Sequence, residues 1–188
     1  FVDSNPDPHE FNSVQPNLQM MVETAIDYFV QAGYQKIGFI GGKSWDSTEG
    51  RNVLRDTRTR CFESRARELG LFNPEHVFIG DNFSVDSGYQ VGREIVEKGK
   101  ADLPQAFLVA SDPLAVGVLQ AFNENRLTVP DDVAMISIND IDIAKYVSPP
   151  LTTFRIDTEE LGKVAVETLR NLIVSPKKSK RMILLDAD

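Results

Sequence analysis

The segment from Val133 to Ile138 constrains the fold of this chain more than any other. It is a nearly continuous apolar run (VAMISI), entered from the polar turn 129–132 and followed by Asn139, Asp140 and Asp142. Such a run is typical of a strand buried on both faces, as in a parallel sheet covered by helices. Ligands bind at the carboxyl ends of strands in open α/β sheets, so the polar exit suggests a binding edge. A buried strand with a solvated exit loop is the other interpretation.

Short apolar runs and helical patterns alternate along the rest of the chain. Further strands are expected at 36–40, 77–79, 106–110 and 182–185, and helices at 20–32, 57–69, 86–98, 112–125 and 157–174. Gly33 and Gly70 follow two helical patterns as C-terminal caps. Asp112 is predicted as an N-cap, with Pro113 at the first helical position. The segment 148–153 contains two prolines and is expected to be extended. The pattern predicts an α/β fold with a doubly wound parallel sheet and helices on both faces.

Composition excludes several classes of protein. The 188 residues are 41% hydrophobic and 26% charged, and no apolar run approaches the roughly 20 residues of a membrane span. The formal net charge of -8 argues against nucleic-acid contacts by these residues, because phosphate binding depends on clustered Lys and Arg. A single cysteine, Cys61, is compatible with a reducing cytoplasm. The N-terminus at Phe1 lacks the features of a signal peptide and resembles the tail of a strand.

No catalytic, metal or cofactor site is expected. Gly42-Lys43-Ser44 resembles the end of a phosphate-binding loop, but position 37 is isoleucine where that motif needs glycine. His9 and His76 lack the paired spacing of metal ligands. Cys61 lies within a helical pattern, where a small buried residue is the usual interpretation. The sequence therefore predicts a protein that is not an enzyme.

A binding site is better supported. Polar and aromatic side chains follow the ends of several predicted strands, and one arginine begins the helix at 57–69. The set is Asp3, Arg58, Phe83, Ser111 and Asn139. Carboxylate, amide, hydroxyl and guanidinium groups can bond neighbouring sugar hydroxyls, and an aromatic ring can cover the apolar face of a sugar. Arg58 could also be a solvated residue of an arginine-rich helix, and Phe83 a core residue beneath a loop.

Over nearly its whole length the chain resembles the lactose/galactose repressor family, whose effector domain has the periplasmic-binding-protein fold. The resemblance depends on the order and spacing of several motifs, among them KIGFIGG at 36–42, SDPLAVGVLQAF at 111–122, VPDDV at 129–133 and PPLTT at 149–153. It implies that Asp3, Arg58, Phe83, Ser111 and Asn139 contact a sugar. Family members usually have asparagine at position 111, aspartate at 139 and glycine at 61, so the identity of the sugar is open.

The resemblance also implies a division of the chain. Residues 1–16 would end the N-terminal effector subdomain, 17–155 would form the C-terminal subdomain, 156–181 would be a returning helix of the N-terminal subdomain, and 182–188 a final strand of the C-terminal subdomain. A helix-turn-helix head would precede Phe1 and contact operator DNA. The expected function is the effector domain of a cytoplasmic transcription repressor. An extracellular sugar-binding protein of a transport system is the alternative, and the sequence before Phe1 would separate the two.

A homodimer is expected as well. The apolar stripe of helix 112–125 would face the sheet, which leaves Val116 and Gly117 toward the surface, where another chain could approach closely. Tyr146 and Val147, beyond the strand at 133–138, have no clear core partner. In the resembling family the corresponding positions form the contact between monomers. The other interpretation is that these side chains cover the strand end within one subunit.

Overall fold

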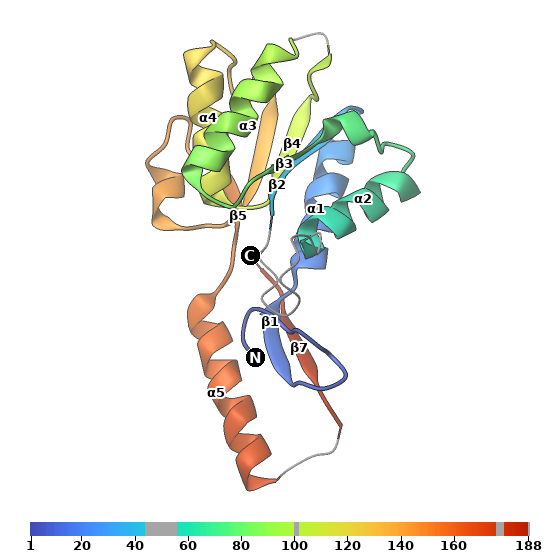
Figure 1. Cartoon of the computed structure of the whole chain (residues 1–188), viewed down its shortest axis with the longest axis vertical. Helices are drawn as coiled ribbons and strands as arrows, with labels where there is room; N and C mark the ends of the chain where they lie inside the picture. The colour runs from blue at the N-terminus through green and yellow to red at the C-terminus, as the bar shows by residue number, and fades with distance from the viewer. Residues whose placement is uncertain (44–55, 100–101, 176–178, 188) are drawn as a thin grey trace. The chain divides into compact units, whose positions relative to one another are not determined.

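The computed structural model describes residues 1–43, 56–99, 102–175 and 179–187 (Figure 1). They divide into two units, which are described separately. Unit 1 comprises Phe1–Asn17 and Arg155–Asp188, and unit 2 comprises Leu18–Phe154. Most of the predicted loop at 43–55 lies outside the described residues.

Unit 2 is built on a sheet with strand order β3-β2-β4-β5-β6. Its strands are β2 (Ile37–Gly42), β3 (Val77–Gly80), β4 (Ala106–Val109), β5 (Ala134–Asn139) and β6 (Thr152–Arg155). β2 pairs in parallel with both β3 and β4, and β4 pairs in parallel with β5. The carboxyl ends of these four strands therefore lie at one edge of the sheet.

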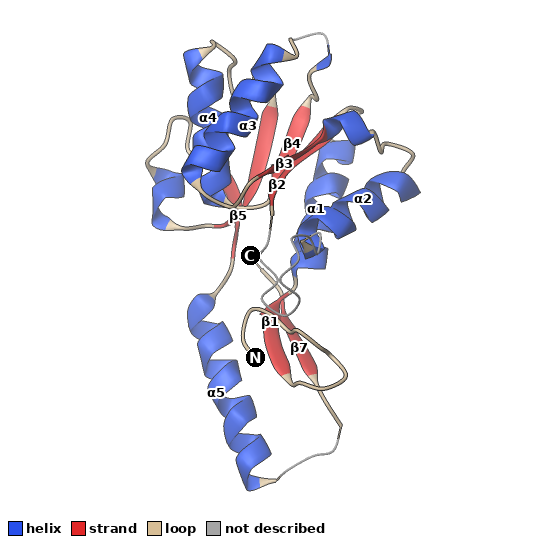
Figure 2. Ribbon diagram, viewed as in Figure 1, coloured by secondary structure: helices blue, strands red, loops and turns tan. Residues whose placement is uncertain are grey.

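Helices cover both faces of this sheet (Figure 2). α1 (Leu18–Gln31) and α2 (Thr57–Glu68) pack together on one face, and α3 (Val85–Glu97) and α4 (Asp112–Glu124) pack together on the other. Short 3₁₀ helices, η1 (Pro74–His76) and η3 (Asp142–Lys145), precede β3 and follow β5. Gly33 and Gly70 adopt positive φ angles after α1 and α2, as expected for C-terminal caps. The predicted doubly wound α/β fold is confirmed.

The apolar positions of α1 recur at helical spacing and are buried against the sheet. The core also contains several phenylalanines, and Phe39 of β2 stacks on Phe62 of α2 with ring centroids 5.1 Å apart. Phe107 of β4 lies between Phe78 and Phe122, with centroid distances of 6.0 and 6.4 Å. Aromatic burial of this kind contributes a large part of the apolar area removed from water.

Glycines allow α3 and α4 to pack unusually closely. A Cβ atom at Gly117 would lie 2.5 Å from the backbone nitrogen of Tyr89 and closer still to the carbonyl oxygen of Val85. A Cβ atom at Gly88 would lie 2.8 Å from the Cα atom of Leu114. The prediction that Gly117 faces the surface is therefore wrong. Its missing side chain makes room for a helix of the same chain, and only the half-buried Val116 remains partly accessible.

Unit 1 contains a two-stranded parallel sheet of β1 (Ser13–Pro16) and β7 (Met182–Leu185), with α5 (Thr158–Val174) beside it. The Asp157 side chain caps α5 by accepting a hydrogen bond from the backbone nitrogen of Glu160. The strand predicted at 182–185 is present, but it pairs with β1 and does not join the sheet of unit 2. The strand therefore lies in unit 1, whereas the resemblance had assigned 182–188 to the C-terminal subdomain, because a short apolar strand does not reveal its partner.

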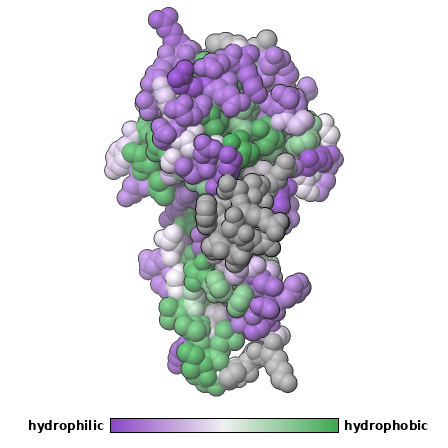
Figure 3. Space-filling view, viewed as in Figure 1, coloured by the Kyte–Doolittle hydropathy of each residue, from purple (hydrophilic) through white to green (hydrophobic). Residues whose placement is uncertain are grey.

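The outer face of α5 is uncovered. Val166, Leu169 and Ile173 are 68%, 59% and 72% exposed, and hydrophobic residues gather over this helix in Figure 3. Leu161 is the buried residue of the helix. Across the described parts of the chain, no helix combines the length and the apolar character needed to cross a membrane.

Candidate ligand-binding site

Arg58 is held in one orientation at the carboxyl edge of the unit 2 sheet. Asp56 caps α2 by accepting from the backbone nitrogen of Arg58, and its carboxylate also accepts from Nε at 2.7 Å and from the second terminal nitrogen at 2.9 Å. The remaining terminal nitrogen donates to the carbonyl oxygen of Ala110 at 2.6 Å, directly after β4. Both charged side chains are largely buried, at 14% and 13% exposure. Such a bidentate pair fixes a guanidinium with geometric precision.

Phe83 lies beneath this guanidinium. The central carbon of the Arg58 guanidinium is 4.6 Å from the centroid of the Phe83 ring, within the range of a cation–π contact. Gly42, at the end of β2, lets the backbone of Asn82 approach, because a Cβ atom there would be 2.6 Å from the Asn82 carbonyl oxygen. The half-buried ring therefore belongs to the same edge as Arg58 and is not a core residue beneath a loop.

Ser111 follows β4 at the same edge and is 3% exposed. It is the N-cap residue of α4, yet its side chain makes no capping hydrogen bond. Among the described residues its Oγ atom has no hydrogen-bond partner at all. Leaving a buried hydroxyl unpaired costs about 1–3 kcal/mol, so this atom is suited to bond an incoming ligand.

Asn139 ends β5, the strand next to β4, and is half-buried. Its φ angle is 123°, and that of Asp140 is 53°. Two successive non-glycine residues with positive φ are rare and are found mostly at sites where backbone strain serves a function. The structure thus brings Arg58, Phe83, Ser111 and Asn139 to one edge of unit 2.

Asp3 belongs to unit 1. Its backbone nitrogen donates to the carbonyl oxygen of Val14 at 2.9 Å, and its φ angle is 63°. Its convergence with the four residues of unit 2 stays a prediction.

Asp112 differs from its predicted role. The helix begins at this residue, with Ser111 as the cap, and the carboxylate turns away from the helix. It accepts hydrogen bonds from Ser137 Oγ, Thr153 Oγ1 and the backbone nitrogen of Ile141, and it is completely buried. The N-cap rule identified the right region, but a Ser-Asp pair leaves open which residue caps the helix. Only tertiary contacts decide it.

Lys43 of the phosphate-loop pattern forms an ion pair with Asp81 at 2.7 Å, and Ser44 of that pattern lies outside the described residues. The hydrogen bond from Lys43 lowers the pKa of the Asp81 carboxyl below its ordinary value.

Cys61 in α2 is partly buried, and this burial is the main reason why the pKa of its thiol is raised. The thiol is therefore a poor nucleophile at neutral pH. Within the described residues, no group of three or more His, Cys, Asp or Glu could hold a metal ion.

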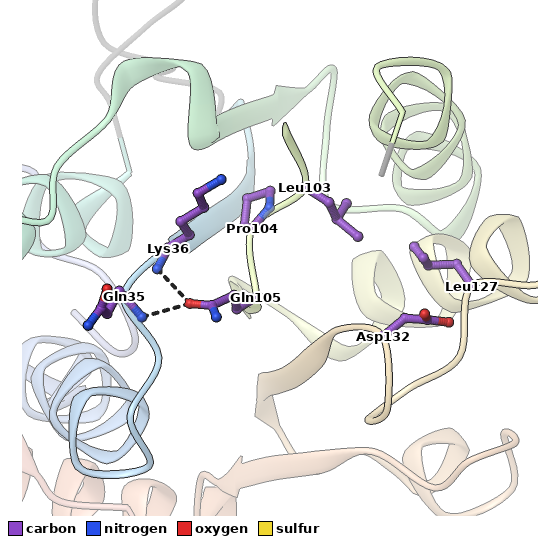
Figure 4. Close-up of a pocket in the computed structure, with 7 residues that line it drawn as sticks. All are labelled: Gln35, Lys36, Leu103, Pro104, Gln105, Leu127 and Asp132. Atoms are coloured by element: carbon purple, nitrogen blue, oxygen red, sulfur yellow. Dashed lines mark hydrogen bonds between the residues drawn. The ribbon is translucent and has the colours of Figure 1, made fainter. Parts of the chain in front are cut away.

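Two cavities of about 390 Å³ each lie at the opposite, amino edge of the sheet. Figure 4 shows the first, where the Gln105 side chain accepts hydrogen bonds from the backbone nitrogens of Gln35 and Lys36 at 2.8 and 3.0 Å. Leu103, Pro104, Leu127 and Asp132 complete its lining. His76 lines the second cavity, and burial is the main cause that lowers the pKa of its ring. Neither cavity includes a predicted site residue.

Comparisons with known proteins agree with this architecture. A family profile described as a periplasmic binding protein-like domain matches residues 26–187. The HTH-type transcriptional regulator LacR of Lactobacillus helveticus is 43% identical over 178 residues, which are 95% of this chain and 52% of LacR. The regulator GanR of Bacillus subtilis is 38% identical over 188 residues, which are all of this chain and 57% of GanR. The chain thus spans about half the length of these relatives.

Solved structures share the fold. A LacI family transcriptional regulator from Arthrobacter, in complex with lactose, superimposes with a TM-score of 0.82 at 22% identity, covering all of this chain and 67% of that one. The Lac repressor bound to ONPG gives a TM-score of 0.84 at 23% identity, covering all of this chain and 54% of the repressor. The resemblance found in the sequence is confirmed by these relatives, and the chain belongs to the periplasmic binding protein-like domain family.

Proposed function

We propose that this chain is the effector-binding part of a cytoplasmic transcription repressor that responds to a sugar. The single observation that carries this proposal is the arrangement at the carboxyl edge of unit 2. There, the guanidinium of Arg58 is fixed above Phe83, and the unpaired hydroxyl of Ser111 and the amide of Asn139 follow neighbouring strands. These groups offer donors, acceptors and an aromatic face, which is what a polyhydroxylated ligand requires.

The relatives support a regulatory role over a transport role, because those compared above are transcriptional regulators. Related structures hold lactose and ribose, which supports a sugar as the ligand class. Asp3 of unit 1 stays a predicted sugar-contacting residue, on the resemblance to the repressor family. Sugar binding changes the affinity for operator DNA, which is contacted by an N-terminal helix-turn-helix outside this chain. Such coupling requires that the sugar bind one conformation of the repressor better than another.

The experiment is a thermal-shift titration of the full-length protein with lactose, galactose and ribose. A ligand that binds the native state raises the melting temperature. The Asn139→Ala variant should fold normally, because it removes little core volume. It should lose this shift in melting temperature, because it removes the paired hydrogen bonds that the Asn139 amide would form with the sugar. Asn125→Ala is the matched control, since Asn125 is the C-cap residue at the far end of α4 and its side chain donates to the Ala121 carbonyl oxygen. An undiminished shift in Asn139→Ala would contradict the assigned site.

We also propose that the protein is a homodimer through the segment after β5. Ile141, Ile143 and Tyr146 are 40%, 44% and 81% exposed, and they are neighbours in sequence. Exposed apolar groups that gather in this way mark interaction surfaces. The half-buried Val116 and Val147 would lie at the margin of the contact, whereas Gly117 is enclosed by α3 and takes no part.

A further inference from the structure

The turn formed by Asn139 and Asp140 needs an external restraint. Left-handed φ angles of 123° and 53° at two successive non-glycine residues are disfavoured, because the Cβ atom crowds the backbone. Such a residue is strained and persists only where surrounding contacts hold its backbone in place. Asn139 is a candidate ligand residue, so whatever holds this turn also sets the direction of its side chain.

Asp112 and Thr153 supply the restraint. Asp112 Oδ2 accepts from the backbone nitrogen of Ile141 at 2.8 Å, immediately after the turn. The backbone nitrogen of Asp140 donates to Thr153 Oγ1 at 3.2 Å, and that hydroxyl in turn donates to Asp112 Oδ1 at 2.7 Å. The two residues thus hold two consecutive backbone N–H groups of the turn.

The same carboxylate is anchored on the sheet. Ser137 Oγ, two residues before Asn139 in β5, donates to Asp112 Oδ1 at 2.5 Å. Asp112 is completely buried, and Ser137, Ile141 and Thr153 bond its carboxylate as neutral hydrogen-bond donors. Moving a buried carboxylate bonded in this way is energetically unfavourable, because each lost donor leaves a carboxylate oxygen without water or a hydrogen-bond partner. Asp112 therefore keeps a fixed position against which the turn is held.

We propose that Asp112 and Thr153 are positioning residues of the effector site, which set sugar affinity without touching the sugar. This inference rests on the proposed function. Asp112 follows Ser111 directly, so one carboxylate fixes the turn that carries Asn139 relative to the strand end that carries Ser111. Thr153 lies in β6, the strand that leads out of unit 2. The hydroxyl therefore joins the ligand edge to the exit strand of this unit.

The first test uses the full-length protein and two variants of one residue. Thr153→Val keeps the shape of the side chain but loses the hydroxyl, whereas Thr153→Ser keeps the hydroxyl. Affinity should be measured calorimetrically for whichever of lactose, galactose and ribose raises the melting temperature most. If the binding-competent turn falls to about a tenth of the population, the apparent affinity falls about tenfold. We expect that loss in Thr153→Val and near-normal affinity in Thr153→Ser.

A rescue experiment separates positioning from a general structural role. In the wild type, the Thr153 hydroxyl holds Asp140 in its strained backbone conformation. Glycine adopts a φ of 53° freely, so Asp140→Gly removes part of this strain and the turn depends less on the hydroxyl. Adding Asp140→Gly to Thr153→Val should restore most of the affinity, and adding Asp140→Ala should not. The two double variants lose the same carboxylate and differ only in backbone freedom. Equal affinities of the two double variants would overturn the proposal, as would wild-type affinity in Thr153→Val.

Hydrogen exchange of the sugar-free protein tests the restraint independently of any ligand. The amides of Asp140 and Ile141 should exchange faster in Thr153→Val than in Thr153→Ser, because their hydrogen-bond acceptors are lost or loosened. Unchanged exchange at both amides would refute the restraint whatever the sugar results. If the wild-type protein bound no sugar of the panel, the proposed function would fail, and the exchange result would still decide whether Asp112 and Thr153 hold the turn.

Discussion

Replacing Gly117 by alanine should destabilise unit 2, even though alanine is the better helix former. The new Cβ atom would lie 2.5 Å from the Tyr89 backbone nitrogen, and real Cβ atoms essentially never come within 3.0 Å of another heavy atom. Because the opposing atoms belong to the α3 backbone, they cannot rotate away as a side chain would. The two helices must therefore separate by more than about 0.5 Å, since the Val85 carbonyl oxygen lies even closer to the new Cβ atom than the Tyr89 nitrogen does.

The magnitude follows from two opposed effects. Overpacking of this kind costs about 1–3 kcal/mol, and the rigid backbone neighbours favour the upper end of that range. The higher helix propensity of alanine relative to glycine offsets about 1 kcal/mol of this overpacking cost. We expect a net loss of about 2 kcal/mol in the free energy of unfolding, measured by urea denaturation monitored by circular dichroism.

Gly162→Ala provides the matched control. Gly162 lies inside α5, and nothing is within 4 Å of the position where its Cβ atom would be. The same substitution should therefore stabilise that helix, by up to about 1 kcal/mol. If Gly117→Ala were as stable as the wild type or more stable, the close packing of α3 on α4 would be incorrect.

Two further predictions concern pH and assembly. The pKa of His76 is lowered chiefly by burial, so the folded state binds its proton less readily than the unfolded state. Its contribution to stability is complete above the unfolded pKa of about 6.5 and is lost as the pH falls through the lower folded value. As the pH is lowered from about 7 to 5, the urea midpoint of His76→Asn should therefore fall less than that of the wild type. An equal fall of the urea midpoint in the two proteins would contradict this prediction. Light scattering of the full-length protein at micromolar concentration should give the mass of a dimer. Tyr146→Asp should reduce this mass, and Tyr28→Asp, at an exposed position on α1, should leave it unchanged. A monomer mass for the wild type would refute the interface.

Much of unit 2 could be predicted because its signals are local. The apolar runs at 36–40, 106–110 and 133–138 became the central strands, and the glycines after α1 and α2 ended those helices. Arg58 and Phe83 could be assigned to one edge because parallel strands end together.

Features that depend on tertiary contacts could not be predicted. The apolar pattern of α4 identified the face toward the sheet, but it did not reveal that α3 encloses Gly117. The strand β1 has no clear apolar alternation, so neither the strand nor its pairing with β7 was foreseen. The left-handed turn at Asn139 depends on Asp112 and Thr153, which are 27 and 14 residues away from it in sequence.

The small sheet of unit 1 implies an uneven resistance to proteases. β1 and β7 have four residues each, and a two-stranded sheet is only marginally stable in water without further packing. Unit 1 should therefore open locally at a much lower free energy than the five-stranded unit 2. Limited digestion should cut within 1–17, 155–175 and 179–187 before it cuts within the helices and strands of unit 2.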